Sequence, residues 1–428
     1  MKNLKAIILL FVANFVSSVA QGISMLAIPW YFTMQAEMER FGYIYLITNI
    51  IALFWVPYSG TIVDKYNRKN IFLILMGVIG SIILSIALLG FHLGTLPWVL
   101  IVCVFMLTFF NYNLHYPTLY SFVQEITEEK YYSRITSILE IQGQLATILS
   151  GAGAAFLLEG TKNGVLNILG FNIEFGFELN PWQIYEIFLL DATTYFLGFG
   201  IILLIKFRPL KQRTKVVDSV RLQLKTGWNF LVDNKSIFVF GVASYAIFVS
   251  ILIEGFYLLP IYVKNQMQRG GDVFASADMY YALGAVLAGV FIRIIFEKIR
   301  IPESIIMLTF ATALIYFCLY FELSLNIFFL LMLALGVVNA GSRIQRVNFL
   351  FLNIPNQVYG RANSIFNMAN ILFRIFFLAV FSMTFFQLGN NIIYAFLILG
   401  IFLIIACIIL YYNSKQFNKE HSFTNLDT

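Results

Sequence analysis

Charged residues are scarce in this chain. Asp, Glu, Lys and Arg fill only 12% of its 428 positions, whereas hydrophobic residues fill 60%. A water-soluble protein of this length needs more polar surface than that, because its exterior must be hydrated. The composition therefore excludes a soluble globular protein and predicts an integral membrane protein.

Cysteine and histidine are also rare. Cys103, Cys318 and Cys407 all lie within apolar runs, which argues against a disulfide framework and against a metal cluster. The three histidines have no metal-ligand spacing. The chain has no phosphate-binding glycine loop and no nucleophile with a base at useful spacing. We therefore expect no cofactor, no metal and no ATP-driven transport, and a membrane-embedded enzyme is the disfavoured class.

Long apolar runs are what the chain does have. Windows of about 20 apolar residues fit helices that cross a bilayer, and they are too long for barrel strands. The first run is too long for a cleavable signal and has no small-residue cleavage site after it, so we expect it to be retained. We count twelve candidate spans, near residues 5–32, 42–62, 70–91, 96–121, 132–158, 183–205, 236–262, 273–295, 303–321, 325–350, 362–386 and 389–412.

Basic residues are distributed unevenly between the connections. With the N-terminus inside, the inside connections carry 23 of the 28 Lys and Arg residues, the outside ones carry four, and Arg374 lies within a span. Cytoplasmic loops show this excess, so both termini are predicted to be cytoplasmic. The basic balance fits loops that face anionic lipid rather than nucleic acid. The longest outside connection, residues 159–182, contains Gly and Asn residues that predict an irregular lid or a pair of turns.

The longest inside connection, residues 206–235, divides the chain near its middle. Residues 217–232 within it carry apolar side chains at helical spacing, namely Val217, Val220, Leu224, Trp228 and Leu231. We expect an interfacial helix that lies on the bilayer surface. It would join an N-terminal half, 1–205, to a C-terminal half, 236–412, followed by a cytoplasmic tail, 413–428.

Two short patterns recur in both halves. Pro29-Trp30-Tyr31 near the end of the first span returns as Pro260-Ile261-Tyr262 near the end of the seventh. Arg134-Ile135-Thr136-Ser137-Ile138 opens the fifth span, and Arg361-Ala362-Asn363-Ser364-Ile365 opens the eleventh. Each pair occupies the same relative helix with the same orientation. The predicted fold is therefore all-α, with twelve transmembrane helices in two six-helix halves related by a parallel pseudo-two-fold axis.

The connection between the second and third spans has a distinctive order. Residues 60–69 read Gly-Thr-Ile-Val-Asp-Lys-Tyr-Asn-Arg-Lys. The bland interpretation is an ordinary basic loop, yet the pattern resembles the loop signature of the major facilitator superfamily. The usual Gly before the last two basic residues is Asn67 here, and Asn tolerates the left-handed backbone that such a Gly supplies. The resemblance implies a cytoplasmic conformational gate formed by Gly60, Asp64, Arg68, Lys69 and Arg361.

Further stretches resemble one branch of that superfamily. They are Ala27-Ile28-Pro29-Trp30-Tyr31, Pro117-Thr118, Asp191 and Gly360-Arg361-Ala362-Asn363-Ser364. They are similar to the macrolide-efflux and siderophore-export group of drug:proton antiporters. One departure is that Ser150-Gly151-Ala152-Gly153-Ala154 has no Pro, whereas related antiporters carry a Gly-Pro pair late in this helix.

The branch resemblance implies a function. It implies a monomer in the bacterial cytoplasmic (inner) membrane that exports hydrophobic or amphiphilic small molecules of the drug or macrolide type. Protons would be the coupling partner, exchanged by alternating access. The alternative with the same fold is export of an endogenous siderophore or a lipid-like metabolite.

Polar side chains form stripes along three predicted spans, at the spacing of one helix face. A lipid-facing helix needs no such stripe, so we expect these residues to line a cavity, although hydrogen bonds between helices are the other interpretation. His115 joins them as a candidate from the fourth span. The predicted substrate cavity comprises Asn14, Ser17, Gln21, His115, Gln144, Asn367, Asn370 and Arg374.

Four charges within predicted spans stand out, namely Glu140, Asp191, Glu254 and Arg374, and each is costly there if it has no partner. A carboxylate in an apolar cavity can exchange protons, so our order of candidates for proton coupling is Glu254, then Glu140, then Asp191. The alternative for Glu254 is a permanent ion pair with Arg374. The alternative for Asp191 is a structural hydrogen bond in a peripheral helix.

Overall fold

The computed structural model describes residues 3–161, 163–210, 220–321 and 323–424; in that part, the side chains of residues 64, 129, 133, 223, 293, 356, 357 and 416–424 are left out. Twelve of the described helices are long and apolar enough to cross a membrane, which confirms the predicted number of spans. The first six are α1 (Leu4–Met34), α2 (Met38–Lys65), α3 (Arg68–Leu93), α4 (Trp98–Ile126), α5 (Tyr132–Glu159) and α6 (Ile184–Leu204). Five of the last six are α11 (Gly271–Ile295), α12 (Ile301–Leu319), α13 (Leu325–Asn353), α14 (Asn356–Phe381) and α15 (Ile393–Thr424).

The seventh span, Lys235–Gln266, is helical throughout but irregular. It consists of α8 (Lys235–Ser244), α9 (Ala246–Ile253), a π-helical turn η2 (Glu254–Leu258), α10 (Leu259–Ile261) and a second π-helical turn η3 (Tyr262–Gln266). Pro260 has no N–H, so the ordinary α-helical bond to Phe256 cannot form. Leu259 N–H instead donates to the Glu254 carbonyl. Short π-helical turns of this kind occur often at functional sites.

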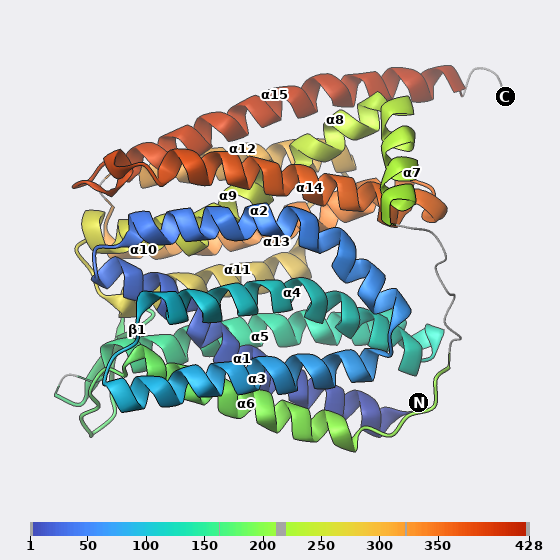
Figure 1. Cartoon of the computed structure of the whole chain (residues 1–428). Helices are drawn as coiled ribbons and strands as arrows, with labels where there is room; N and C mark the ends of the chain where they lie inside the picture. Colours follow the sequence, from blue (N-terminus) through green and yellow to red (C-terminus); the bar gives the residue numbers. More distant parts are fainter. Residues whose placement is uncertain (1–2, 162, 211–219, 322, 425–428) are drawn as a thin grey trace. The chain divides into compact units, whose positions relative to one another are not determined.

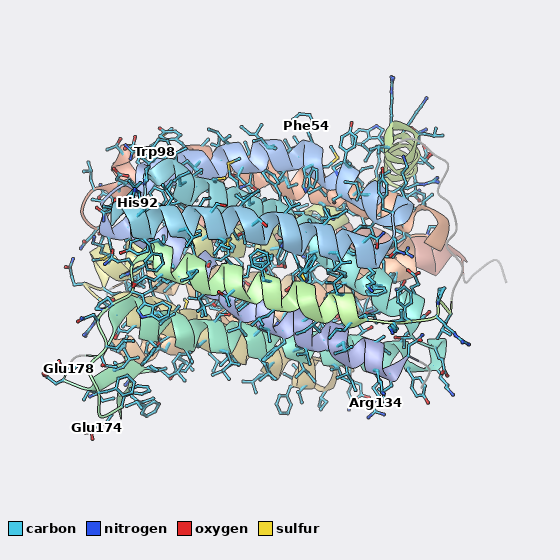
Figure 2. The ribbon with its side chains drawn as sticks, turned by 60° about the horizontal axis from the view of Figure 1, so that its bottom comes forward. Phe54, His92, Trp98, Arg134, Glu174 and Glu178 are labelled. Carbon is cyan, nitrogen blue, oxygen red and sulfur yellow. The ribbon has the colours of Figure 1, made fainter. Side chains whose placement is uncertain are left out.

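The first compact unit comprises Met1–Glu37, Phe54–Val217 and Arg269–Met279. Within it, α6 packs against both α1 and α3, α1 also packs against α5, and α3 packs against α4 (Figure 1). Figure 2 shows Arg134 at one end of this unit, and His92, Trp98, Glu174 and Glu178 at the opposite end. The residues predicted to lie at inside and outside connections are thus at opposite ends of the unit, and which end faces the cytoplasm stays a prediction.

The connection between α5 and α6 contains a β-hairpin where the sequence predicted an irregular lid or a pair of turns. β1 (Val165–Ile168) pairs antiparallel with β2 (Phe171–Glu174), and Leu169 and Gly170 form the turn with positive φ at both positions. Such a turn matches the twist of a hairpin. Leu169 is unusual at this position, and its backbone N–H donates to Ser276 Oγ at 3.0 Å. This contact, distant in sequence, explains why local turn rules did not predict the hairpin.

The second compact unit comprises Met38–Leu53, Asp218–Gln268 and Tyr280–Thr428. Within it, α12 packs against α13 and α15, and α14 packs against α9. The units thus take in short segments, 38–53 and 269–279, that differ from a simple division at residues 206–235. The predicted division into halves stays a prediction.

A short helix, α7 (Val220–Asp233), occupies most of the stretch in which helical spacing was predicted. Figure 1 shows α7 running across the end of α14 rather than alongside it. The two helices approach closely at Gly227, where an added Cβ would lie 2.7 Å from the Arg361 carbonyl carbon. Leu231 on α7 is fully buried and belongs to a core cluster with Phe349 and Phe366. Part of the apolar face of α7 therefore packs against the protein, whereas Trp228 on that face is 50% exposed. The place of α7 on the bilayer surface stays a prediction.

Helices α11 and α13 approach each other backbone to backbone. A Cβ at Gly284 would collide with the carbonyl oxygen of Leu333, and a Cβ at Gly336 would collide with that of Tyr281. Small residues allow this close approach, which is common between helices in membranes. The contact places the neighbouring side chains of Tyr281 and Asn339 within hydrogen-bonding reach, and Asn339 Nδ2 donates to the Tyr281 hydroxyl.

Candidate functional site

Two predicted cavity residues meet in the first unit. His115 Nε2 on α4 lies 2.8 Å from Asn14 Oδ1 on α1, and both side chains are buried. Phe72 places its ring edge-on to the imidazole, with centroids 5.0 Å apart. The contact joins residues 101 positions apart and gives His115 a polar partner.

A second polar contact in this unit joins α4 to α6. Asn111 Nδ2 donates to the Tyr195 hydroxyl at 3.0 Å. One turn before Tyr195, Asp191 is fully buried, and neither carboxylate oxygen has a hydrogen-bond partner among the described residues. Ser24 on α1 is the hydroxyl beside it but lies outside hydrogen-bond geometry. The structural hydrogen bond considered for Asp191 is therefore not formed.

Glu140, predicted for proton coupling, accepts a hydrogen bond from the Tyr120 hydroxyl at 2.8 Å. This contact links α5 to α4. The remaining predicted cavity residues of this unit differ in burial: Ser17 is buried, whereas Gln21 and Gln144 are half-buried. The stripe on α1 thus lies on a face that is buried in part and open in part.

Glu254 lies at the start of the π-helical turn η2, and only 3% of its surface is exposed. Ser250 lies one turn before it on the same span, Tyr316 is its electrostatic neighbour, and Tyr281 is in turn an electrostatic neighbour of Tyr316. The hydrogen bond between Asn339 and Tyr281 extends this polar group to α13. One carboxylate, three hydroxyls and an amide from four spans of the second unit therefore gather around one irregular turn.

Arg374 lies on α14 with 7% of its surface exposed. Tyr45 is its electrostatic neighbour, and Nε has no hydrogen-bond partner in the described part of the chain. Among the described residues no carboxylate lies within ion-pair distance of Arg374. The Glu254–Arg374 pair, which was the alternative considered for Glu254, is therefore not formed.

Two asparagines precede Arg374 on α14 and were predicted with it. Asn370, one turn before Arg374, is buried and its Oδ1 has no partner among the described residues. Asn367 is half-buried. The three residues are spaced by three and four positions, so they follow one face of the helix.

Sequence reasoning missed a buried charge at Arg346, which was assigned to an inside connection. Arg346 is 5% exposed and stacks over the Tyr245 ring at 3.9 Å. Its guanidinium also donates to the Ser244 carbonyl at 3.2 Å, and the Tyr245 hydroxyl donates to Asn363 Oδ1 at 3.0 Å. Arg343 and Arg346 look alike in sequence, and only packing shows that the second is buried.

The basic loop between α2 and α3 forms specific contacts within the first unit. Arg68 forms an ion pair with Glu125 at the end of α4, at 2.7 Å. Lys69 Nζ donates to the carbonyls of Leu203 and Ile205, at 3.1 and 2.8 Å, where α6 ends. A cation is stabilised at a helix C-terminus, because carbonyls without helical partners gather there. The loop is thus more than a basic surface, and Glu125 is a partner that the sequence did not reveal.

Asn67 has a different role from the one expected. Its backbone is extended, with φ of −69°, and is not left-handed. Its side chain caps α3 by accepting hydrogen bonds from the N–H groups of Lys69 and Asn70. Asn is a favoured N-cap residue, so the substitution of the usual Gly fits this geometry.

Three predicted gate residues remain. Gly60 is exposed, and an added Cβ there would meet no atom within 4 Å. The side chain of Asp64 lies outside the described part of the structure. Arg361 lies at the start of α14, where its backbone packs against Gly227. The gate assigned to these residues stays a prediction.

A groove of about 370 Å³ lies between the N-terminal part of α1 and the start of α5. Its lining is mostly apolar, with Arg134 and Tyr131 as its polar members. None of the predicted cavity or proton-coupling residues lines it.

The chain was compared with known families and proteins. The model of the Major Facilitator Superfamily matches residues 10–378. No curated protein matches the chain. Several solved transporter structures are similar in fold. A mutant form of the nucleoside transporter NupG is 15% identical with a TM-score of 0.72, covering 95% of this chain and 99% of that one.

Two further structures show the same similarity. A D-xylose–proton symporter is 13% identical with a TM-score of 0.68, covering 95% of this chain and 97% of the other. A bacterial homologue of the iron transporter ferroportin, inward-facing, is 15% identical with a TM-score of 0.66, covering 97% and 100%. These structures have different cargoes in their titles, so the similarity shows the fold and does not identify a substrate.

Proposed function

The chain belongs to the major facilitator superfamily, and from that premise we propose that it exports hydrophobic or amphiphilic small molecules in exchange for protons. It is a multi-pass membrane protein of a transporter family, with twelve spans. Export, proton coupling and the drug-like substrate class are the proposal. So are the bacterial cytoplasmic membrane, the cytoplasmic termini and the monomeric state.

The observation that carries proton coupling is the surroundings of Glu254. This carboxylate is almost fully buried in a membrane span, at a π-helical turn, beside Ser250 and Tyr316. Ionisable groups inside membranes mark proton and substrate pathways. The absence of an ion pair with Arg374 supports this role further, because that pair would keep the carboxylate ionised in a fixed contact.

The proposed mechanism is alternating access, in which residues 1–205 rock against residues 236–412. Glu140 has a hydroxyl donor in Tyr120 and is the second candidate for proton transfer. Asp64, together with Arg68 and Lys69, would close the cytoplasmic gate. The Arg68 ion pair and the Lys69 contacts attach the start of α3 to the ends of α4 and α6. Such attachment supports a gate whose helices move together.

The test is substrate-driven proton movement in inverted membrane vesicles with an acidified lumen. Vesicles that contain the wild-type chain are exposed in turn to a macrolide, to a cationic dye, to the neutral dye phenylnaphthylamine and to the anionic dye anilinonaphthalenesulfonate. We expect at least one of them to release protons from the lumen, and we expect Glu254→Gln to abolish the release with insertion intact. The matched control is Glu303→Gln, because Glu303 is exposed at the first turn of α12 in the same unit.

Two outcomes would contradict the proposal in different ways. Release that is unchanged in Glu254→Gln would remove Glu254 from coupling. No release with any probe would contradict drug antiport. The alternative would then be export of a siderophore or a lipid-like metabolite, visible as a change in what accumulates outside iron-starved cells. The buried charge of Arg374 favours that alternative, because a neutral or cationic drug would leave it uncompensated.

A further inference from the structure

Arg374 is a buried cation without a counter-charge in its own unit. Its guanidinium lies within a membrane span, and no ion pair to it is formed by the described residues. An ionised group in such surroundings is costly unless an opposite charge or strong hydrogen bonds compensate it. Its neighbour Tyr45 has no charge to offer and already donates its hydroxyl to the Leu252 carbonyl at 3.3 Å.

Two buried polar atoms at and near Arg374 lack hydrogen-bond partners among the described residues, and a ligand could supply them. Among the residues that the structure describes, Nε of Arg374 has no hydrogen-bond partner, and neither does Oδ1 of Asn370 one turn away on the same face of α14. A guanidinium presents several N–H donors in a fixed planar fork, which matches the oxygens of a carboxylate, sulfonate or phosphate. Phe256, whose ring lies 6.0 Å from that of the buried Tyr45, is partly exposed and provides apolar surface nearby.

We propose that Arg374, with Tyr45 beside it, binds the anionic group of an amphiphilic substrate. This inference rests on the proposed export function and narrows it: of the amphiphiles considered, those with one negative charge would fit. The apolar part of such a molecule would lie against aromatic surface, and its anionic group would supply the charge that the protein lacks at this position. Arg374 would then determine specificity by charge, separately from proton transfer at Glu254.

The experiment uses two dyes with nearly the same ring system. Anilinonaphthalenesulfonate carries one negative charge, and phenylnaphthylamine carries none. Binding of each to the full chain in phosphatidylcholine nanodiscs is measured by fluorescence, with empty nanodiscs subtracted. We expect Arg374→Gln to weaken binding of the sulfonate by about tenfold or more, as loss of a charged hydrogen bond implies, and to leave the neutral dye within about twofold.

Two further variants keep the test decisive. Arg374→Lys retains the charge without the planar fork and is expected to give an intermediate loss for the sulfonate. Tyr45→Phe serves if Arg374→Gln does not fold: it removes the hydroxyl oxygen that helps to orient the Arg374 guanidinium, and it is therefore expected to weaken binding of the sulfonate selectively. The inference is overturned if the sulfonate binds no better than to empty nanodiscs, or if Arg374→Gln changes both dyes equally or neither.

Failure of this inference and failure of the export proposal are separable. If the neutral dye drives proton release in vesicles and Arg374→Gln leaves binding of the sulfonate in nanodiscs unchanged, the export proposal stands and the anion site is contradicted. If the sulfonate binds in an Arg374-dependent way and no probe drives proton release, the anion site stands and drug antiport does not.

Discussion

Replacing Gly284 by Ala should force apart the two helices that position part of the candidate site. A Cβ at this position would lie 2.9 Å from the carbonyl carbon of Leu333 and 3.0 Å from the nitrogen of Val337, and closer still to the Leu333 oxygen. These atoms belong to backbone, so they cannot rotate away as a side chain can. Helices α11 and α13 must therefore separate, and Gly336→Ala should act in the same way because it faces Tyr281.

The expected magnitude follows from this geometry. Overpacking a well-packed contact costs about 1–3 kcal/mol, and we expect the upper part of that range because the whole helix must move. Separation should also stretch the hydrogen bond between Asn339 and Tyr281, next to the group around Glu254. Transport should therefore fall together with stability.

The assay measures thermal or denaturant unfolding of the purified chain, alongside proton release in vesicles. Gly289→Ala is the matched control, because Gly289 lies on the same helix and an added Cβ there meets no atom within 4 Å. Since Ala is the better helix former, the control should be neutral or stabilised by up to about 1 kcal/mol.

The reasoning is refuted if Gly284→Ala and Gly336→Ala unfold like the control. That result would mean that the two helices do not touch through their backbones. If both variants lose stability but transport fully, the contact is real and the link from it to the polar group around Glu254 is wrong.

Two other changes have definite expectations. Glu125→Gln leaves the partly buried Arg68 without its ion-pair partner and should lower the free energy of unfolding by about 3 kcal/mol. The control Glu128→Gln removes the more exposed pair with Lys130 and should lower it by less than about 1 kcal/mol. Equal losses in the two variants would contradict the argument. Gly227→Ala should push α7 away from the Arg361 backbone and speed tryptic cleavage within α7, whereas an unchanged cleavage rate would show that this contact does not hold the helix.

The number of the spans could be predicted from local apolar runs, whereas their ends were placed only to within several residues, as the prediction of 96–121 for α4 (Trp98–Ile126) shows. In the hydrocarbon core each backbone polar group must form a hydrogen bond within its own helix. A span is therefore recognised as a local apolar run of the right length. Even the helix α7 between the halves was visible as apolar spacing over residues 217–232. The hairpin at residues 165–174 was not, because Leu169 is held in its turn by a hydroxyl from Ser276, about a hundred positions away.

For the polar groups, too, the sequence predicted which residues lie within spans but not which of them form contacts. The sequence marked Asn14, His115 and Arg374 as polar residues within spans, and the structure adds that the first two form a hydrogen bond. It also shows that Arg374 and Glu254 do not pair.

Three features followed only from packing. Arg346 is buried although it resembles a loop residue, Glu125 pairs with Arg68, and Asn67 caps a helix with an extended backbone. None of these has a local signature, because the partner or the covering element lies elsewhere in the chain.

The order of residues alone therefore established that this is a membrane protein, how many spanning helices it has and which charges are candidates. It could do so because each helix must satisfy the bilayer separately, through its own local run of residues. Which charges meet and which stay unpaired was decided by tertiary structure. Contacts such as Asn14 with His115 join residues far apart in sequence, and only the packing of whole helices brings their side chains within hydrogen-bonding distance.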